Sequence, residues 1–66
     1  MVPKTGEVLH NGAVVIEATN RVILAQWINE HTPFVTWVYY GNDPRTTAHG
    51  HYYTSLYDAV ADYQAR

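Results

Sequence analysis

Two histidines separated by one residue form the pattern in this chain that most resembles metal chemistry. His49 and His51 flank Gly50, and residues i and i+2 of a strand point to the same face, roughly 6.5–7 Å apart. Two imidazoles on one face can bind one ion such as zinc. The candidates for a third ligand are His10, His31 and Asp43. The alternative is that hydrogen bonds or water satisfy both imidazoles, and we predict no cofactor.

Aromatic residues are the second notable group, with two Trp, six Tyr and one Phe among 66 residues. Tyr and Trp are enriched at protein interfaces because they combine a large apolar area with a polar group. We therefore predict a protein-binding surface. The expected contact residues are Trp37, Tyr39, Tyr52, Tyr57 and Trp27. The alternative is that the same rings fill the core.

An aromatic sheet face can also stack the bases of single-stranded nucleic acid, which requires a basic surround. The chain carries four Lys and Arg against six Asp and Glu, a formal net charge of -2. Its basic residues stand in four separate places: Lys4, Arg21, Arg45 and Arg66. Nucleic acid is therefore the less favoured partner.

Catalytic motifs are missing from the sequence. There is no phosphate-binding loop, dinucleotide-binding glycine pattern, H-E-x-x-H or G-x-S-x-G. The absence of cysteine excludes disulfides, thiolate zinc sites and a Cys nucleophile. Ser55 lies close to His51 in sequence, but we assign it to the start of a helix. We predict that the protein is not an enzyme.

The chain contains several β-prone runs separated by turn residues. Asn11-Gly12 lies between the runs 8–10 and 13–16 and favours a two-residue type I′ hairpin turn. Segment 21–28 is either a buried strand or two turns of helix, and its short length favours the strand. The remaining predicted strands are 34–40 and 46–53.

The C-terminus changes to a helical period. Apolar residues recur at i, i+3, i+4 and i+7, namely Leu56, Ala59, Val60 and Tyr63. This spacing predicts a helix over 55–65, with Ser55 and Asp58 as a start resembling a capping box. Asp58 and Asp62 are expected to form an acidic stripe on its exposed side.

These elements predict an α+β fold, an antiparallel β-meander of four to five strands with one C-terminal helix packed on one face. We expect residues 1–6 to be a flexible tail and residues 7–66 to form a single domain. One helix leaves the other sheet face open, and a domain this small has a thin core. The expected partner is another protein, including a second copy in a homodimer. The run 22–25, which no other apolar run exceeds in length, is too short to span a membrane, so we expect a cytoplasmic protein.

Three segments carry a resemblance to known proteins: Val35-Thr36-Trp37, Gly50-His51-Tyr52-Tyr53, and the run from Leu56 to Tyr63. Together they resemble small bacterial proteins carried on phages and plasmids, most of them uncharacterised. The resemblance implies a β-meander with a closing helix, and an accessory protein of a mobile element that acts on a host protein. It transfers no functional residues.

Overall fold

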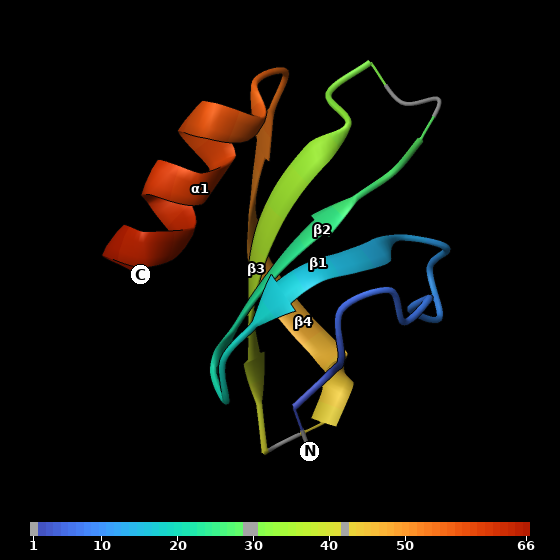
Figure 1. Cartoon of the computed structure of the whole chain (residues 1–66). Helices are drawn as coiled ribbons and strands as arrows, with labels where there is room; N and C mark the ends of the chain where they lie inside the picture. Colours follow the sequence, from blue (N-terminus) through green and yellow to red (C-terminus); the bar gives the residue numbers. More distant parts are fainter. Residues whose placement is uncertain (1, 29–30, 42) are drawn as a thin grey trace.

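The protein folds into one four-stranded sheet and one helix. A computed structural model describes residues 2–28, 31–41 and 43–66. In chain order the elements are β1 (Val14–Ala18), β2 (Val22–Gln26), β3 (Phe34–Tyr40), β4 (Asp43–Tyr53) and α1 (Leu56–Ala65). The sheet is antiparallel in the order β1-β2-β3-β4, so each strand pairs with its neighbours in sequence (Figure 1). The predicted α+β meander is confirmed, with four strands.

The ambiguous segment 21–28 contains strand β2, so the helical alternative is wrong. All four residues of Val22–Ala25 are buried. In a strand these side chains point alternately to the two faces, so their burial requires cover on both sides of the sheet. This explains why the sequence shows an unbroken apolar run instead of alternation.

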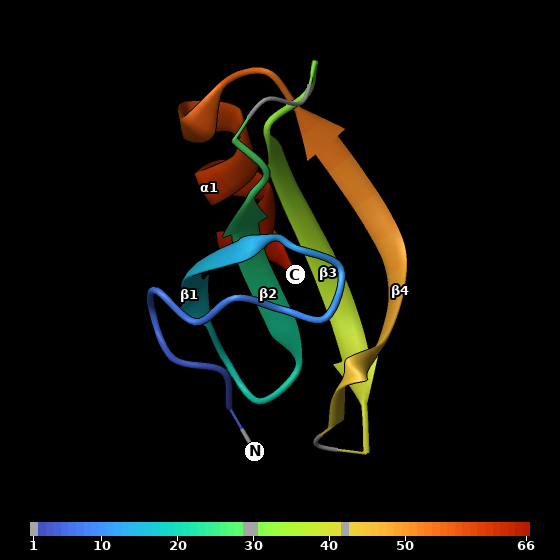
Figure 2. The same ribbon diagram turned by 90° about the vertical axis from the view of Figure 1, so that its right-hand side faces the viewer.

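The chain before β1, residues 2–13, covers one face of the sheet, and we call it the N-terminal segment. The Gly6 N–H donates to the Val15 carbonyl (2.7 Å), and the Thr5 hydroxyl donates to the Ile16 carbonyl (2.8 Å). The segment then crosses the sheet on the side opposite α1 (Figure 1, Figure 2). Thr5 and Gly6, which belong to the predicted tail, thus lie along β1. The expected open face is covered by this segment.

The turn at Asn11-Gly12 forms with a different geometry from the predicted one. The Leu9 N–H donates to the Ala13 carbonyl, and the Gly12 N–H donates to the Leu9 carbonyl. This is the pattern of a three-residue hairpin loop that ends in a residue at positive φ, here Gly12 at 90°. Asn11 does not have the positive φ that a type I′ turn needs, so that prediction is wrong.

The core lies in two layers, one on each side of the sheet. On the N-terminal side, a buried cluster contains Leu9, Ala13, Val15, Ile23, Ala25, Val35, Trp37 and Tyr39. On the other side, α1 packs on β2, β3 and β4. Ala59 is fully buried in this layer, as are Leu24 and Thr36, which pair across β2 and β3.

Helix α1 begins after Ser55, as the apolar spacing predicts. Ser55 has extended backbone angles and occupies the N-cap position, but its side chain makes no capping hydrogen bond. The capping box suggested by Ser55 and Asp58 is therefore not formed. No helix among the described residues has the length and apolar character needed to cross a membrane.

Candidate functional site

Three of the aromatic residues predicted to contact a partner meet on the side of the sheet that faces the N-terminal segment. Trp27 follows β2, Trp37 lies in β3 and Tyr52 lies in β4. The Trp27 ring meets the Trp37 ring edge to face, with centroids 5.2 Å apart and planes at 81°. The Trp27 ring is also nearly parallel to the Tyr52 ring, at 7° and 6.3 Å. We call Trp27 and Tyr52 the aromatic pair.

Trp37 and the N-terminal hairpin loop hold the aromatic pair in place. Trp37 is only 5% exposed and forms the floor, whereas Tyr52 is 51% exposed. The Trp27 indole N–H donates to the Asn11 carbonyl (3.2 Å), which ties the pair to the N-terminal hairpin loop. The two outer rings thus pack against other residues and remain partly accessible.

Gly50 allows the rings to approach β4. A β-carbon at this position would lie 2.8 Å from Trp37 Nε1 and 2.8 Å from the Tyr52 hydroxyl oxygen. The pairing of β3 and β4 shifts at this point, because Thr36 pairs with His51 whereas Val38 pairs with Ala48. His49 and Gly50 therefore stand opposite Trp37 as a β-bulge, a feature that redirects side chains at sheet edges.

Tyr39 does not belong to the aromatic pair. It is a core residue, and its hydroxyl donates a 2.5 Å hydrogen bond to the Thr19 carbonyl. Burial raises the pKa of Tyr39. Tyr39 and Trp37 were expected at a partner surface because the sequence shows their alternation but not the layer that covers them. In this structure both lie beneath the N-terminal segment, which corrects that placement.

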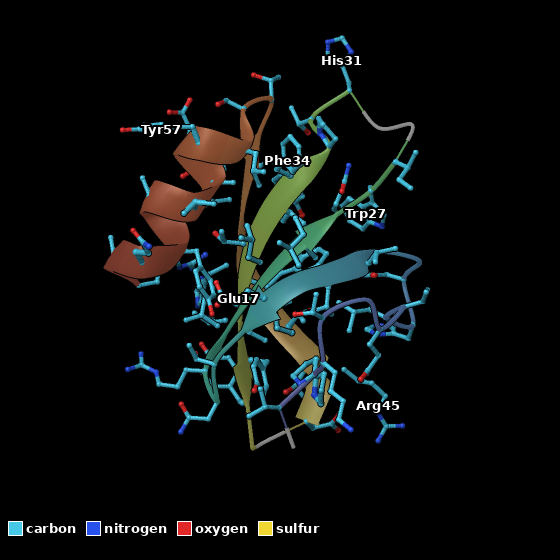
Figure 3. All side chains as sticks on the ribbon, in the orientation of Figure 1. Glu17, Trp27, His31, Phe34, Arg45 and Tyr57 are labelled. Carbon is cyan, nitrogen blue, oxygen red and sulfur yellow. The ribbon has the colours of Figure 1, made fainter. Side chains whose placement is uncertain are left out.

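Tyr57 is likewise separate from the other selected residues. It lies in the first turn of α1, is 83% exposed and points away from the sheet (Figure 3). Trp27 lies on the opposite side of the sheet in the same view. The structure therefore brings together three of the five selected aromatic residues and leaves Tyr39 and Tyr57 elsewhere.

The two histidines are held in different ways. His51 Nδ1 lies 2.9 Å from Asp62 Oδ2 on the facing helix. His49 sits in the bulge, at the positive φ of 53°, and is exposed. Within residues 2–28, 31–41 and 43–66 no three His, Asp or Glu side chains come close enough to share a metal ion. His10, His31 and Asp43 thus do not complete a metal site with the His49-x-His51 pair.

Asp62 is a residue whose place the sequence did not reveal. It was expected on the exposed side of the helix, but it faces the sheet and is mostly buried. Its Oδ2 accepts a 2.5 Å hydrogen bond from the hydroxyl of Thr36. The Arg66 guanidinium donates to the same hydroxyl oxygen (3.0 Å), to the Thr36 carbonyl (3.1 Å) and to the His49 carbonyl (2.8 Å). The i, i+4 spacing of Asp62 and Arg66 was the available signal.

The pKa of Asp62 reflects this network. Burial alone would raise the pKa, but hydrogen bonds from Thr36 and His51 and the nearby charge of Arg66 lower it below the ordinary carboxyl value. The carboxylate therefore remains ionised and bonded. No described side chain leaves a buried nitrogen or oxygen atom without a partner. The network links α1 to β3 and β4, in addition to the apolar packing between the helix and the sheet.

An open hollow of about 570 Å³ lies at one end of the sheet. The turn that joins β1 to β2 and the C-terminal end of β3 lie at this end (Figure 1). The residues that line the hollow are Asn20, Arg21, Val38, Tyr39, Tyr40, Gly41 and His49. His49 thus faces a surface that is separate from the aromatic pair.

The described residues therefore offer three distinct features: the aromatic pair, the Asp62 network and the hollow beside His49. The first suits contact with a large apolar surface, the second fastens the helix, and the third suits a small ligand. Comparisons of this chain with models of protein families, with curated proteins and with solved structures found no match in any of the three.

Proposed function

We propose that this protein is a non-catalytic protein-binding module that contacts its partner through the aromatic pair, Trp27 and Tyr52. The observation that carries the proposal is the near-parallel packing of these rings at 7° on the buried floor of Trp37. Rigid aromatic residues lose little conformational entropy on binding and dominate the energetics of protein interfaces.

The position of the pair supports this proposal. Tyr52 belongs to β4, which among the described residues has a paired neighbour, β3, on one side only. A partner that covers Tyr52 would therefore also meet the backbone of an edge strand, which can pair with another chain. Pro44 and the bulge at His49 restrict such pairing to part of the strand. The proposed contact is thus centred on the Tyr52 end of β4.

The first partner to test is a second copy of this chain. Sedimentation velocity over a wide concentration range, with wild type, Tyr52→Ala and Tyr57→Ala, provides the test. We expect wild type and Tyr57→Ala to form a dimer and Tyr52→Ala to remain monomeric. Tyr57→Ala is the matched control, because it also removes an exposed tyrosine but from the far side of the sheet.

If wild type is monomeric, the partner is a different protein, and the same three proteins serve as baits for affinity capture. We expect a captured protein to be retained by wild type and by Tyr57→Ala and lost with Tyr52→Ala. Equal capture by all three, or no selective capture, rejects the aromatic pair as the contact. The action of the module on a host protein, as the resemblance to mobile-element proteins implies, stays a prediction.

Single-stranded nucleic acid has less support as a partner of the same rings. Arg45 forms an ion pair with Asp43 at 3.2 Å, and Arg66 is bonded within the Asp62 network. Two of the four cations are therefore already engaged. An NMR titration with a mixed single-stranded DNA oligonucleotide at low salt tests this alternative. Shifts confined to the amides around Trp27 and Tyr52 would favour nucleic acid over a protein partner.

A further inference from the structure

The hollow beside Arg21 and His49 is lined by residues whose formal charges are not negative. Arg21 and His49 line it, and none of the residues found to line it carries a carboxylate. Arg21 is exposed, and its guanidinium has no hydrogen-bonding or ionic partner in the part of the chain that the structure describes. A guanidinium presents a planar set of N–H donors that matches carboxylate and phosphate groups.

The walls of the hollow are held in place by the backbone. The Tyr39 N–H donates to the Arg21 carbonyl (2.9 Å), which fixes the turn between β1 and β2 against β3. The Arg66 guanidinium donates a hydrogen bond to the His49 carbonyl (2.8 Å). Hydrogen bonds to their backbone carbonyls therefore position Arg21 and His49. These bonds do not involve the two side chains that could bind an anion.

His49 also has an unusual backbone conformation. Its φ of 53° makes it the non-glycine residue at positive φ among those described. Such a conformation carries a local energetic cost, and residues that retain it cluster at binding and active sites. The bulge that includes His49 places this histidine on the hollow, whereas His51 faces Asp62.

The remaining lining residues define the rest of the ligand. Val38 is partly buried and Tyr40 is exposed, so the hollow has an apolar wall beside its two donors. Its volume lies within the range of small-molecule sites, about 300–1,000 Å³.

We propose that this hollow binds a small organic anion, namely a phosphate monoester or a carboxylate attached to an apolar ring. Arg21 and His49 donate hydrogen bonds to the anionic group, because an imidazole has an N–H to donate in either protonation state. Val38 and Tyr40 contact the ring. The site is independent of the aromatic pair and of any protein partner.

An NMR titration of the isotopically labelled full chain with phenyl phosphate and, separately, benzoate tests the proposal at constant ionic strength. We expect saturable shifts of the amides of Arg21, Gly41 and His49. Arg21→Gln and His49→Asn are each expected to weaken binding roughly tenfold, as for loss of a hydrogen bond to a charged group. Asparagine tolerates the left-handed backbone conformation, so the second variant removes the imidazole and keeps the bulge. If only one of the two probes binds, the result identifies whether the site takes a phosphate or a carboxylate group.

Arg45→Gln is the matched control, because it removes one exposed positive charge outside the hollow. We expect it to bind both probes like wild type, and we expect benzyl alcohol, which lacks the charge, not to bind. The proposal is overturned if neither anion binds or if Arg21→Gln and His49→Asn bind like wild type. It is also overturned if Arg45→Gln weakens binding to the same extent. Native amide spectra of each variant exclude unfolding as the cause.

Discussion

The hydroxyl group of Thr36 in the middle of β3 donates a 2.5 Å hydrogen bond to Asp62 on α1. Thr36 is fully buried, and its hydroxyl oxygen also accepts a hydrogen bond from Arg66. One small polar side chain therefore joins the sheet to both ends of an i, i+4 pair on the helix. Because every polar atom at this point has a partner, the network fixes how α1 sits on the sheet.

We expect Thr36→Val to destabilise the protein by about 1–3 kcal/mol, since it removes the buried hydroxyl group to which both Asp62 and Arg66 are hydrogen-bonded. Thr36→Ser is the control, because it keeps the hydroxyl and loses one methyl group, which costs about 1 kcal/mol. Urea unfolding followed by tryptophan fluorescence measures both values. A smaller loss for Val than for Ser would show that the methyl group matters more than the hydrogen bonds.

The lowered pKa of Asp62 predicts how stability depends on acid. A carboxyl group whose pKa is lower in the folded state stabilises the fold above the ordinary value of 3.8, and this contribution is lost as the pH falls through the folded pKa. We expect the unfolding free energy of wild type to drop on acidification below that value. Asp62→Asn should be less stable at neutral pH and should lose less on acidification.

Asp43→Asn is the control for this measurement. The pKa of Asp43 is also lowered, mainly by its hydrogen bonds from Arg45, but this pair is exposed and screened by solvent. Its removal should leave the acid transition of the wild type almost unchanged. An Asp62→Asn curve parallel to that of wild type would contradict the assigned role of Asp62.

Arg66→Ala tests the attachment of the helix end. The Arg66 side chain is 13% exposed and bonds to Thr36 and to the His49 carbonyl. We expect a loss of about 1–3 kcal/mol and faster hydrogen exchange in the last turn of α1. Arg45→Ala, which removes a side chain that is 78% exposed, should leave stability and exchange in α1 unchanged. Similar behaviour of the two variants would indicate that the Arg66 hydrogen bonds contribute little.

Gly50→Ala is expected to destabilise the protein by about 1–3 kcal/mol, because the added β-carbon would approach the Trp37 indole at 2.8 Å. A double-mutant cycle identifies the cause. In a Trp37→Phe background, which lacks Nε1, the cost of Gly50→Ala should shrink. Thermal unfolding followed by circular dichroism gives the four values. If the two substitutions have strictly additive effects on the free energy of unfolding, the strain does not come from the contact between residue 50 and Trp37 Nε1.

Trp37→Ala is expected to unfold the protein or to cost about 3–5 kcal/mol, as for a large core truncation. Tyr52→Ala should retain the native amide spectrum, because half of its surface is already in water. The comparison separates the floor of the aromatic pair from its exposed part. A stable, native Trp37→Ala variant would instead indicate that Trp37 is accessible to a partner.

Local patterns in the sequence determined most of the elements. The β-branched and aromatic run at Phe34–Tyr40 is a strand, and the apolar spacing from Leu56 onward is a helix, because period 2 and period 3.6 are properties of a few neighbouring residues. The turn residues between the runs made an antiparallel meander the expected topology. The same patterns showed that Trp37 and Tyr39 share one face of β3.

Only the tertiary structure decided what lies on each face. Periodicity assigns a side chain to a side of its element but does not show which other segment covers that side. The N-terminal segment covers Trp37 and Tyr39, and Asp62 turns toward Thr36 instead of toward water. The bulge at His49 likewise coincides with the close approach of Gly50 to Trp37, a contact between strands that no local pattern of β4 contains.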